Sequence, residues 1–129
     1  MKAPPPAIAY YLHDSVLVKT SLEEDRLVLD LELYSIFYPN EADVKLILSG
    51  ISNLREVAAF HQEVTRLGSK RRPKADRKYK GRLGYRINSF DYAADVPSSK
   101  GQLHLYLDVD HLAPLNIRCT KLEFVPVTE

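Results

Sequence analysis

Apolar and polar residues alternate with a period of two along much of the chain. The clearest stretch is 27–33, where leucines hold the odd positions and acidic residues occur among the even ones. A period of two indicates a β-strand with one face in the core and the other toward solvent. Val16 and Val18 begin a similar alternation, which ends at the polar stretch 21–25. We therefore expect these two segments to form a hairpin.

Shorter alternating segments follow and predict further strands. The turn-forming sequences Pro39–Glu41 and Ser49–Gly50 interrupt them. Beyond the last segment the apolar positions move from odd to even numbers at Leu122 and Phe124, so we expect a β-bulge near Thr120–Lys121. The apolar positions of these strands are Val44, Leu46 and Leu48; Tyr85 and Ile87; Leu103, Leu105, Leu107 and Val109; and Leu115, Ile117 and Cys119.

The apolar spacing changes to three and four residues after Gly50, as on one face of an α-helix. Asn53, followed three residues later by Glu56, resembles a capping box at the helix start, and Gly68 is a common stop signal. His61 lies on the apolar face, where we expect it to pack or to cap a backbone group rather than to titrate functionally. The face consists of Leu54, Val57, Ala58, His61, Val64 and Leu67.

Together these elements predict an α+β fold, with one helix packed on one face of a mostly antiparallel sheet of about six strands. The chain shows no internal repeat of roughly 20 to 50 residues, which excludes solenoids and propellers. Its 129 residues, 45% hydrophobic and 27% charged, are typical of one globular domain. We expect a single domain over 1–129, with a proline-rich N-terminal arm (1–10) and an exposed basic loop (69–82).

The apolar stretches are too short to cross a bilayer, which takes about 20 residues. Residues 1–11 contain three consecutive prolines and lack the apolar core of a secretory signal, so we expect a soluble cytoplasmic protein. The single cysteine, Cys119, cannot form an internal disulfide, and its alternating segment favours packing as a small hydrophobic residue. A nucleophilic role would need a histidine or a cation positioned beside the thiol.

His13-Asp14-Ser15 contains the three residue types of a hydrolase triad. Three neighbours in sequence cannot make the successive hydrogen bonds that a triad requires. A turn that precedes the first strand, with Asp14 or Ser15 bonded to nearby backbone, explains the tripeptide better.

Asp108, Asp110 and His111 offer oxygen and nitrogen ligands close together, and His104 shares a strand face with Asp108. A divalent ion is one interpretation of this segment, and ordinary turn chemistry at the end of a strand is the other. The GxGxxG, GxxxxGK[ST] and GxSxG motifs are absent. We therefore predict no catalytic residue, no metal site and no cofactor.

The distribution of charge is the most unusual feature of the sequence. Residues 70–82 contain eight of the 18 basic residues and one of the 17 acidic ones, a net charge of +7, whereas the remainder has a net charge of −6. Such a segment is a solvated loop, a phosphate-binding site in which a tyrosine stacks on a base, or an attractant for an acidic protein surface. The candidate binding residues are Lys70, Arg71, Arg72, Lys74, Arg77, Lys78, Tyr79, Lys80 and Arg82.

Four segments occur in a characteristic order: 11–15 (Tyr-Leu-His-Asp-Ser), 27–31 (Leu-Val-Leu-Asp-Leu), 46–51 (Leu-Ile-Leu-Ser-Gly-Ile) and 115–119 (Leu-Asn-Ile-Arg-Cys). In this order the chain resembles a group of small bacterial proteins, many of them uncharacterised. Some are similar to predicted immunity proteins of polymorphic-toxin systems, which neutralise a toxin by binding it. The resemblance spans most of the chain but not the basic loop. It implies a non-enzymatic protein that binds a toxin. The alternatives are a nucleic-acid-binding module that uses the basic loop 70–82 and, third, a metal-dependent hydrolase built around Asp108, Asp110 and His111. The sequence leaves the oligomeric state open.

Overall fold

A computed structural model describes residues 12–39, 43–68, 84–94 and 103–127 of the chain. These residues form seven β-strands and one α-helix, which confirms the predicted α+β fold with a helix packed on an antiparallel sheet. In chain order the elements are β1 (Val16–Glu23), β2 (Arg26–Glu32), β3 (Asp43–Ser49), α1 (Leu54–Gly68), β4 (Tyr85–Ala94), β5 (Leu103–Val109), β6 (Leu115–Cys119) and β7 (Lys121–Pro126).

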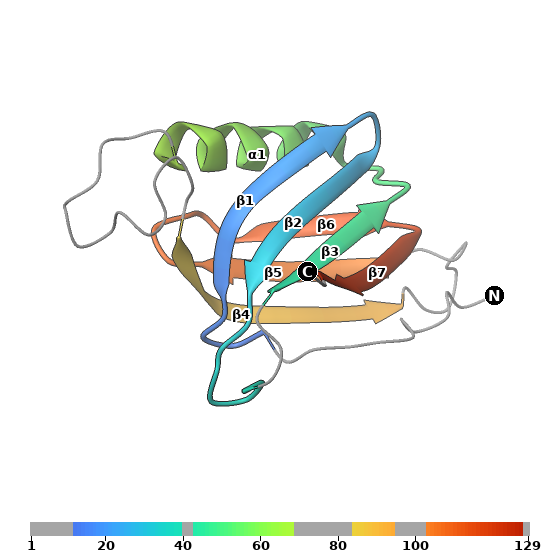
Figure 1. The fold of residues 1–129 in the computed structure, drawn as a ribbon. Coiled ribbons are helices and arrows are strands. Elements are labelled where there is room, and N and C mark those ends of the chain that lie inside the picture. The colour runs from blue at the N-terminus through green and yellow to red at the C-terminus, as the bar shows by residue number, and fades with distance from the viewer. Residues whose placement is uncertain (1–11, 40–42, 69–83, 95–102, 128–129) are drawn as a thin grey trace.

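The seven described strands belong to one sheet, in the order β6-β5-β4-β1-β2-β3-β7. β4 joins the two halves of this sheet, because its first residues pair with β1 and the rest of the strand pairs with β5. The sheet bends at this point, so that β1, β2, β3 and β7 form one layer and β4, β5 and β6 form a layer that faces it (Figure 1). α1 packs against β1 and β6 and therefore bridges the two layers on one side.

The core lies between the two layers and consists of the apolar faces that the alternation predicted. The odd-numbered side chains of β2, β5 and β6 and the even-numbered ones of β3 are buried. Phe90 of β4 and Phe124 of β7 meet edge to face across the layers, with ring centroids 6.3 Å apart. The largest fully buried side chains include Leu12, Leu17, Leu27, Leu29, Leu46, Leu48, Ile87, Leu105, Leu107 and Ile117.

β1 departs from its predicted alternation. Val16 is only partly buried, whereas Leu17 and Val18 are both buried. The pairing register with β2 shifts directly after Leu17, and this irregularity breaks the period of two. The predicted turn is also shorter than expected, because β1 continues to Glu23 and β2 begins at Arg26. The two strands nevertheless form the predicted hairpin.

α1 begins and ends where the sequence predicted, at residues 54 and 68. Its inward face is turned relative to the predicted one: Leu54 is exposed, while Phe60, which the spacing did not include, is buried together with Val57 and Val64. The helix places this face over the end of the core between β1 and β6.

The predicted capping box at the start of α1 is wrong in its geometry. The side-chain oxygen Oδ1 of Asn53 accepts a hydrogen bond from the backbone N of Arg118 in β6, at 2.9 Å. Its Nδ2 donates to the backbone O of Asn116 and to Oε2 of Glu56, both at 2.7 Å. The amide of Asn53 therefore bonds the outer side of β6, where a neighbouring strand would otherwise pair.

The predicted β-bulge at Thr120 is also wrong, because the chain changes neighbours at this residue. β6 ends at Cys119 beside β5, and β7 begins at Lys121 beside β3, at the opposite end of the strand order. The backbone N of Thr120 donates to the O of Ser49 at 3.0 Å. Gly50 follows with φ of +70°, and a Cβ at this residue would overlap Oγ1 of Thr120, so only glycine fits this close approach.

Candidate functional site

The basic segment that the sequence singled out lies outside the described residues. This holds for all its candidate binding residues, namely Lys70, Arg71, Arg72, Lys74, Arg77, Lys78, Tyr79, Lys80 and Arg82. The proline-rich arm, residues 1–10, lies outside them as well. The candidate site of the described residues is therefore built from other parts of the chain.

His13, Asp14 and Ser15 form a turn that precedes β1, as the sequence predicted. The backbone N of Ser15 donates to the O of Leu12 at 2.9 Å, and Asp14 has a φ of +68°. His13 Nε2 lies 3.6 Å from Asp14 Oδ2 and His13 Nδ1 donates to the backbone O of Asn88 at 2.8 Å, whereas Ser15 Oγ accepts from the backbone N of Tyr34. The hydroxyl and the imidazole are not joined as a catalytic triad requires.

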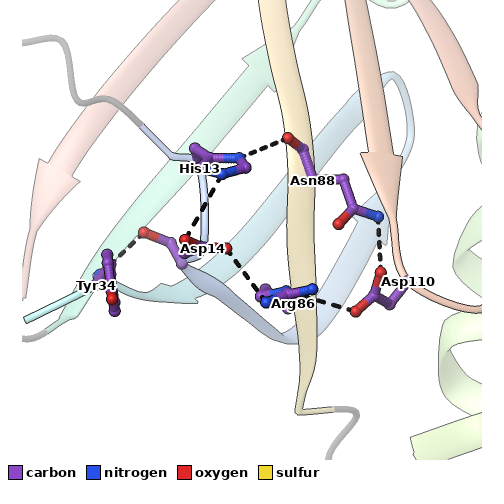
Figure 2. A network of polar contacts seen from close by, with 7 residues as sticks. His13, Asp14, Tyr34, Arg86, Asn88 and Asp110 are labelled. Atoms are coloured by element: carbon purple, nitrogen blue, oxygen red, sulfur yellow. Dashed lines mark hydrogen bonds and ion pairs between the residues drawn. The ribbon is translucent and has the colours of Figure 1, made fainter.

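Asp14 and Asp110 share the guanidinium of Arg86 (Figure 2). Arg86 NH1 lies 3.5 Å from Asp14 Oδ1, and its Nε lies 3.6 Å from Asp110 Oδ2. Asn88 Nδ2 donates to the other carboxylate oxygen of Asp110 at 2.7 Å. The network forms because β4 begins between the start of β1 and the end of β5. It ties these three strand ends together near the surface.

The segment considered for a metal ion is used in other contacts. Both carboxylate oxygens of Asp110 face Arg86 and Asn88, and the ring of His111 packs edge-on against Tyr85 with centroids 4.9 Å apart. Within the ranges that the structure describes, no group of three or more His, Cys, Asp or Glu side chains could hold a metal ion. The turn interpretation explains this segment.

His61 was expected to pack or to cap a backbone group, and its ring is bonded to a side chain of the sheet. Its Nδ1 and the hydroxyl of Thr20 in β1 are joined by a hydrogen bond of 2.6 Å. Thr20 is buried, so a substrate could not approach its oxygen in this structure. The Thr20–His61 hydrogen bond links α1 to β1.

Cys119 is fully buried in the core, which confirms that it packs as a small hydrophobic residue. Burial raises the pKa of the thiol from 9.0 to about 11, because the apolar surroundings disfavour the thiolate. Since the thiolate is the nucleophile, the folded protein holds this thiol in its unreactive form at neutral pH.

The loop after β2, which we call the Tyr34–Pro39 loop, presents apolar side chains to solvent. Ile36 is 70% exposed and Phe37 is 43% exposed. The loop is held in place from within: the backbone N atoms of Phe37 and Tyr38 donate to the O of Tyr34 at 3.1 and 3.0 Å. The rings of Tyr34 and Phe37 also meet edge to face, 5.1 Å apart.

The Tyr34–Pro39 loop adjoins the charged network. The backbone N of Tyr34 donates to Ser15 Oγ at 3.0 Å (Figure 2). Ser15 is buried. Ser15 directly follows Asp14, so this hydrogen bond links the loop to the turn that carries the charged network. The alternating pattern did not predict this loop as a site, although four of the five residues from 34 to 38 are aromatic or aliphatic and lie beyond the end of the predicted strand 27–33.

No protein-family model, no curated protein and no solved structure matches this chain. The candidate site is consequently defined by its own chemistry. In the described part of the chain, no helix has both the length and the apolar character needed to span a membrane.

Proposed function

We propose that this chain is a non-enzymatic protein-binding domain whose contact surface centres on Ile36 and Phe37. The observation that supports the proposal is the exposure of these two side chains on a loop with internal hydrogen bonds. Large apolar side chains that project together from a small domain are typical of protein contact sites.

The surroundings of the loop suit such a contact. A loop that is already held in place loses little conformational entropy when it binds, so more of the contact energy appears as affinity. Charged groups near an apolar centre give orientation and specificity, and the Asp14–Arg86 pair is connected to the loop through Ser15, which bonds the backbone of Tyr34. The side chains of Ile36 and Phe37 would supply affinity, and the charges of Asp14 and Arg86 would select the partner.

The resemblance to immunity proteins adds a finer proposal, in which the partner is a toxin made in the same cytoplasm. An immunity protein acts by occupying a surface of the toxin and needs no catalytic group of its own. The partner would then offer an apolar pocket for Phe37 and Ile36.

The proposal predicts a toxin gene next to the gene for this chain, and binding of the product of that gene is the test. Coproduction of the two proteins should protect cells that the toxin alone kills, and titration calorimetry should detect a direct complex. Ile36→Ser and Phe37→Ser should each weaken the complex by about tenfold or more, as the loss of a central apolar contact does. Leu54→Ser alters an exposed leucine at the start of α1, outside the Tyr34–Pro39 loop. This variant should leave the affinity of the complex unchanged.

Two outcomes would contradict the proposal. Full affinity in both loop variants would show that the contact surface lies elsewhere. Lack of protection, with no complex, would remove the toxin as partner.

The basic segment favours a second candidate, binding of nucleic acid, because +7 within 13 residues attracts phosphates. Binding of short RNA or DNA should then weaken when Arg71, Arg72, Lys74 and Lys78 are changed to Ala, and its dependence on salt should flatten. Wild-type protein that ignores nucleic acid at low salt would eliminate this candidate. If the segment instead steers a protein partner, the same variant should associate with it more slowly, mainly at low salt.

A further inference from the structure

The outward face of β5 and β6 carries polar side chains around one tyrosine. The odd-numbered residues of β5 are buried, so His104, Tyr106 and Asp108 point away from the core. On β6, Asn116 and Arg118 are exposed in the same way. Their exposure shows that α1, which packs against β6, leaves this face open. Tyr106, with 37% of its surface exposed, lies at the centre.

The strand register separates the charges of this face. In the register of β5 and β6, Arg118 lies beside His104 and Asn116 lies beside Tyr106. Asp108 lies two residues beyond Tyr106 on β5, which is about 7 Å along the strand and on the side away from Arg118. The face therefore has a basic end and an acidic end, with the tyrosine between them.

Neither charge at the two ends is neutralised within the described part of the chain. The ion pairs of the described residues involve other side chains, and none includes the guanidinium of Arg118 or the carboxylate of Asp108. Both groups can therefore pair with charges of another molecule without first giving up a partner of that kind.

We infer that this face is a contact between two copies of the chain, related by a two-fold axis that runs across the strands through Tyr106. Rotation by 180° about this axis reverses the strand direction. It brings the partner's Asp108 opposite His104, with a sideways offset from Arg118 of about one strand spacing, roughly 4.8 Å. The same contact forms twice, because a two-fold interface is self-complementary. The two Tyr106 rings meet at the axis.

The position of Asp91 gives a further test of the proposed two-fold axis. Asp91 is exposed on β4 and pairs with Tyr106 in the strand register, so it also lies next to the axis. The same rotation brings the two Asp91 carboxylates face to face. This like-charge contact opposes the association, and Asp91→Asn should therefore strengthen it.

The contact uses one aromatic residue and a few ion-pairing groups of each chain, which places it among weak interfaces. It also uses different residues from the Tyr34–Pro39 loop. Loss of one contact therefore leaves the other intact, and the two proposals can fail separately.

Sedimentation equilibrium of the full chain, at protein concentrations from roughly 10 µM to 1 mM, tests the inference. The wild-type chain should show a monomer–dimer equilibrium. Arg118→Glu and Asp108→Arg should each weaken it by about tenfold or more, because each change creates like charges across the axis. An equimolar mixture of these two variants should form dimers again, since the carboxylate introduced in one variant then faces the guanidinium introduced in the other. Arg55→Glu, an equal change of charge on the exposed side of α1, should have no effect.

A wild-type chain that stays monomeric throughout this range would overturn the inference. Undiminished dimers of Arg118→Glu, or a mixture that does not restore the dimer, would overturn the geometry of the contact. The altered side chains are at the surface, and the circular dichroism of each variant verifies that it is folded. The charge-removing changes Arg118→Gln and Asp108→Asn should also weaken the dimer and keep the test decisive if charge reversal disturbs the fold.

Discussion

The side-chain amide of Asn53 takes the place of a neighbouring strand for Arg118. It accepts the backbone N–H of Arg118 through Oδ1 and donates through Nδ2 to the O of Asn116, two residues earlier on β6. The backbone N of Ser52 donates to the O of Arg118 at 2.8 Å. One short segment before α1 thus satisfies most of the outer side of β6.

Asn53→Ala should consequently destabilise the fold by about 1–2 kcal/mol, because two backbone groups of β6 lose their partners. Urea unfolding followed by circular dichroism measures the change. Glu56→Ala removes only the contact at the helix start and should cost less. Equal losses in the two variants would mean that Asn53 acts as a helix cap and not as a partner of β6.

Gly50→Ala should destabilise the protein by more than about 1 kcal/mol, because alanine is strained at a positive φ. Overlap of the new Cβ with Thr120 Oγ1 adds to this loss. In a Thr120→Gly background the overlap is absent but the backbone strain remains. Gly50→Ala should therefore lower the free energy of unfolding by less in that background than in the wild type. A neutral Gly50→Ala would show that the turn adopts another conformation.

Leu29→Ala and Leu105→Ala should each lower the free energy of unfolding by roughly 2–5 kcal/mol, as the truncation of a core leucine does. These leucines lie on the inner faces of the two opposed layers, so the pair tests both halves of the core. Leu54→Ala, at an exposed leucine, is the control and should cost far less. Similar losses at all three positions would mean that the inward faces are wrongly assigned.

The thiol of Cys119 should be unreactive in the folded protein and should make stability depend on pH. Its folded-state pKa of about 11 lies above the ordinary value of 9.0, so the unfolded chain releases the proton first. The stabilisation by this group is complete below about pH 9 and decreases as the pH rises toward 11. Unfolding midpoints between pH 8 and 11, as approximate limits, should therefore fall more steeply for the wild type than for Cys119→Ala. Fast reaction of the native protein with a thiol reagent at neutral pH would contradict the burial.

Much of the fold follows from the sequence because burial leaves a period of two in a strand and a longer period in a helix. The leucines of β2 and β5 were assigned to the core on that basis alone, and correctly. The register shift after Leu17 could not be predicted, because it depends on how β1 pairs with β2. The break at Thr120 resembled a bulge for a similar reason: a change of phase does not show that the chain has moved to another neighbour.

The candidate site was harder to predict, because its parts are distant in sequence. Asp14, Arg86 and Asp110 come together only when β4 lies between β1 and β5. Exposure of Ile36 and Phe37 is likewise a tertiary property, since an apolar residue after a strand is equally compatible with burial. The basic segment, by contrast, is evident from composition alone, and its role remains a proposal for experiment.

The single-residue link at Thr120, which sends β7 to the far side of β3, has a consequence for the order in which the strands pair during synthesis. β1, β2 and β3 are adjacent both in the chain and in the sheet, so they can pair as soon as they leave the ribosome. The far side of β3 must wait for β7, about 70 residues later. At a synthesis rate of roughly 5–20 residues per second, the unfinished strand stays uncovered for several seconds. During this interval the nascent chain is most exposed to mispairing with other polypeptides, and completion of β7 ends it.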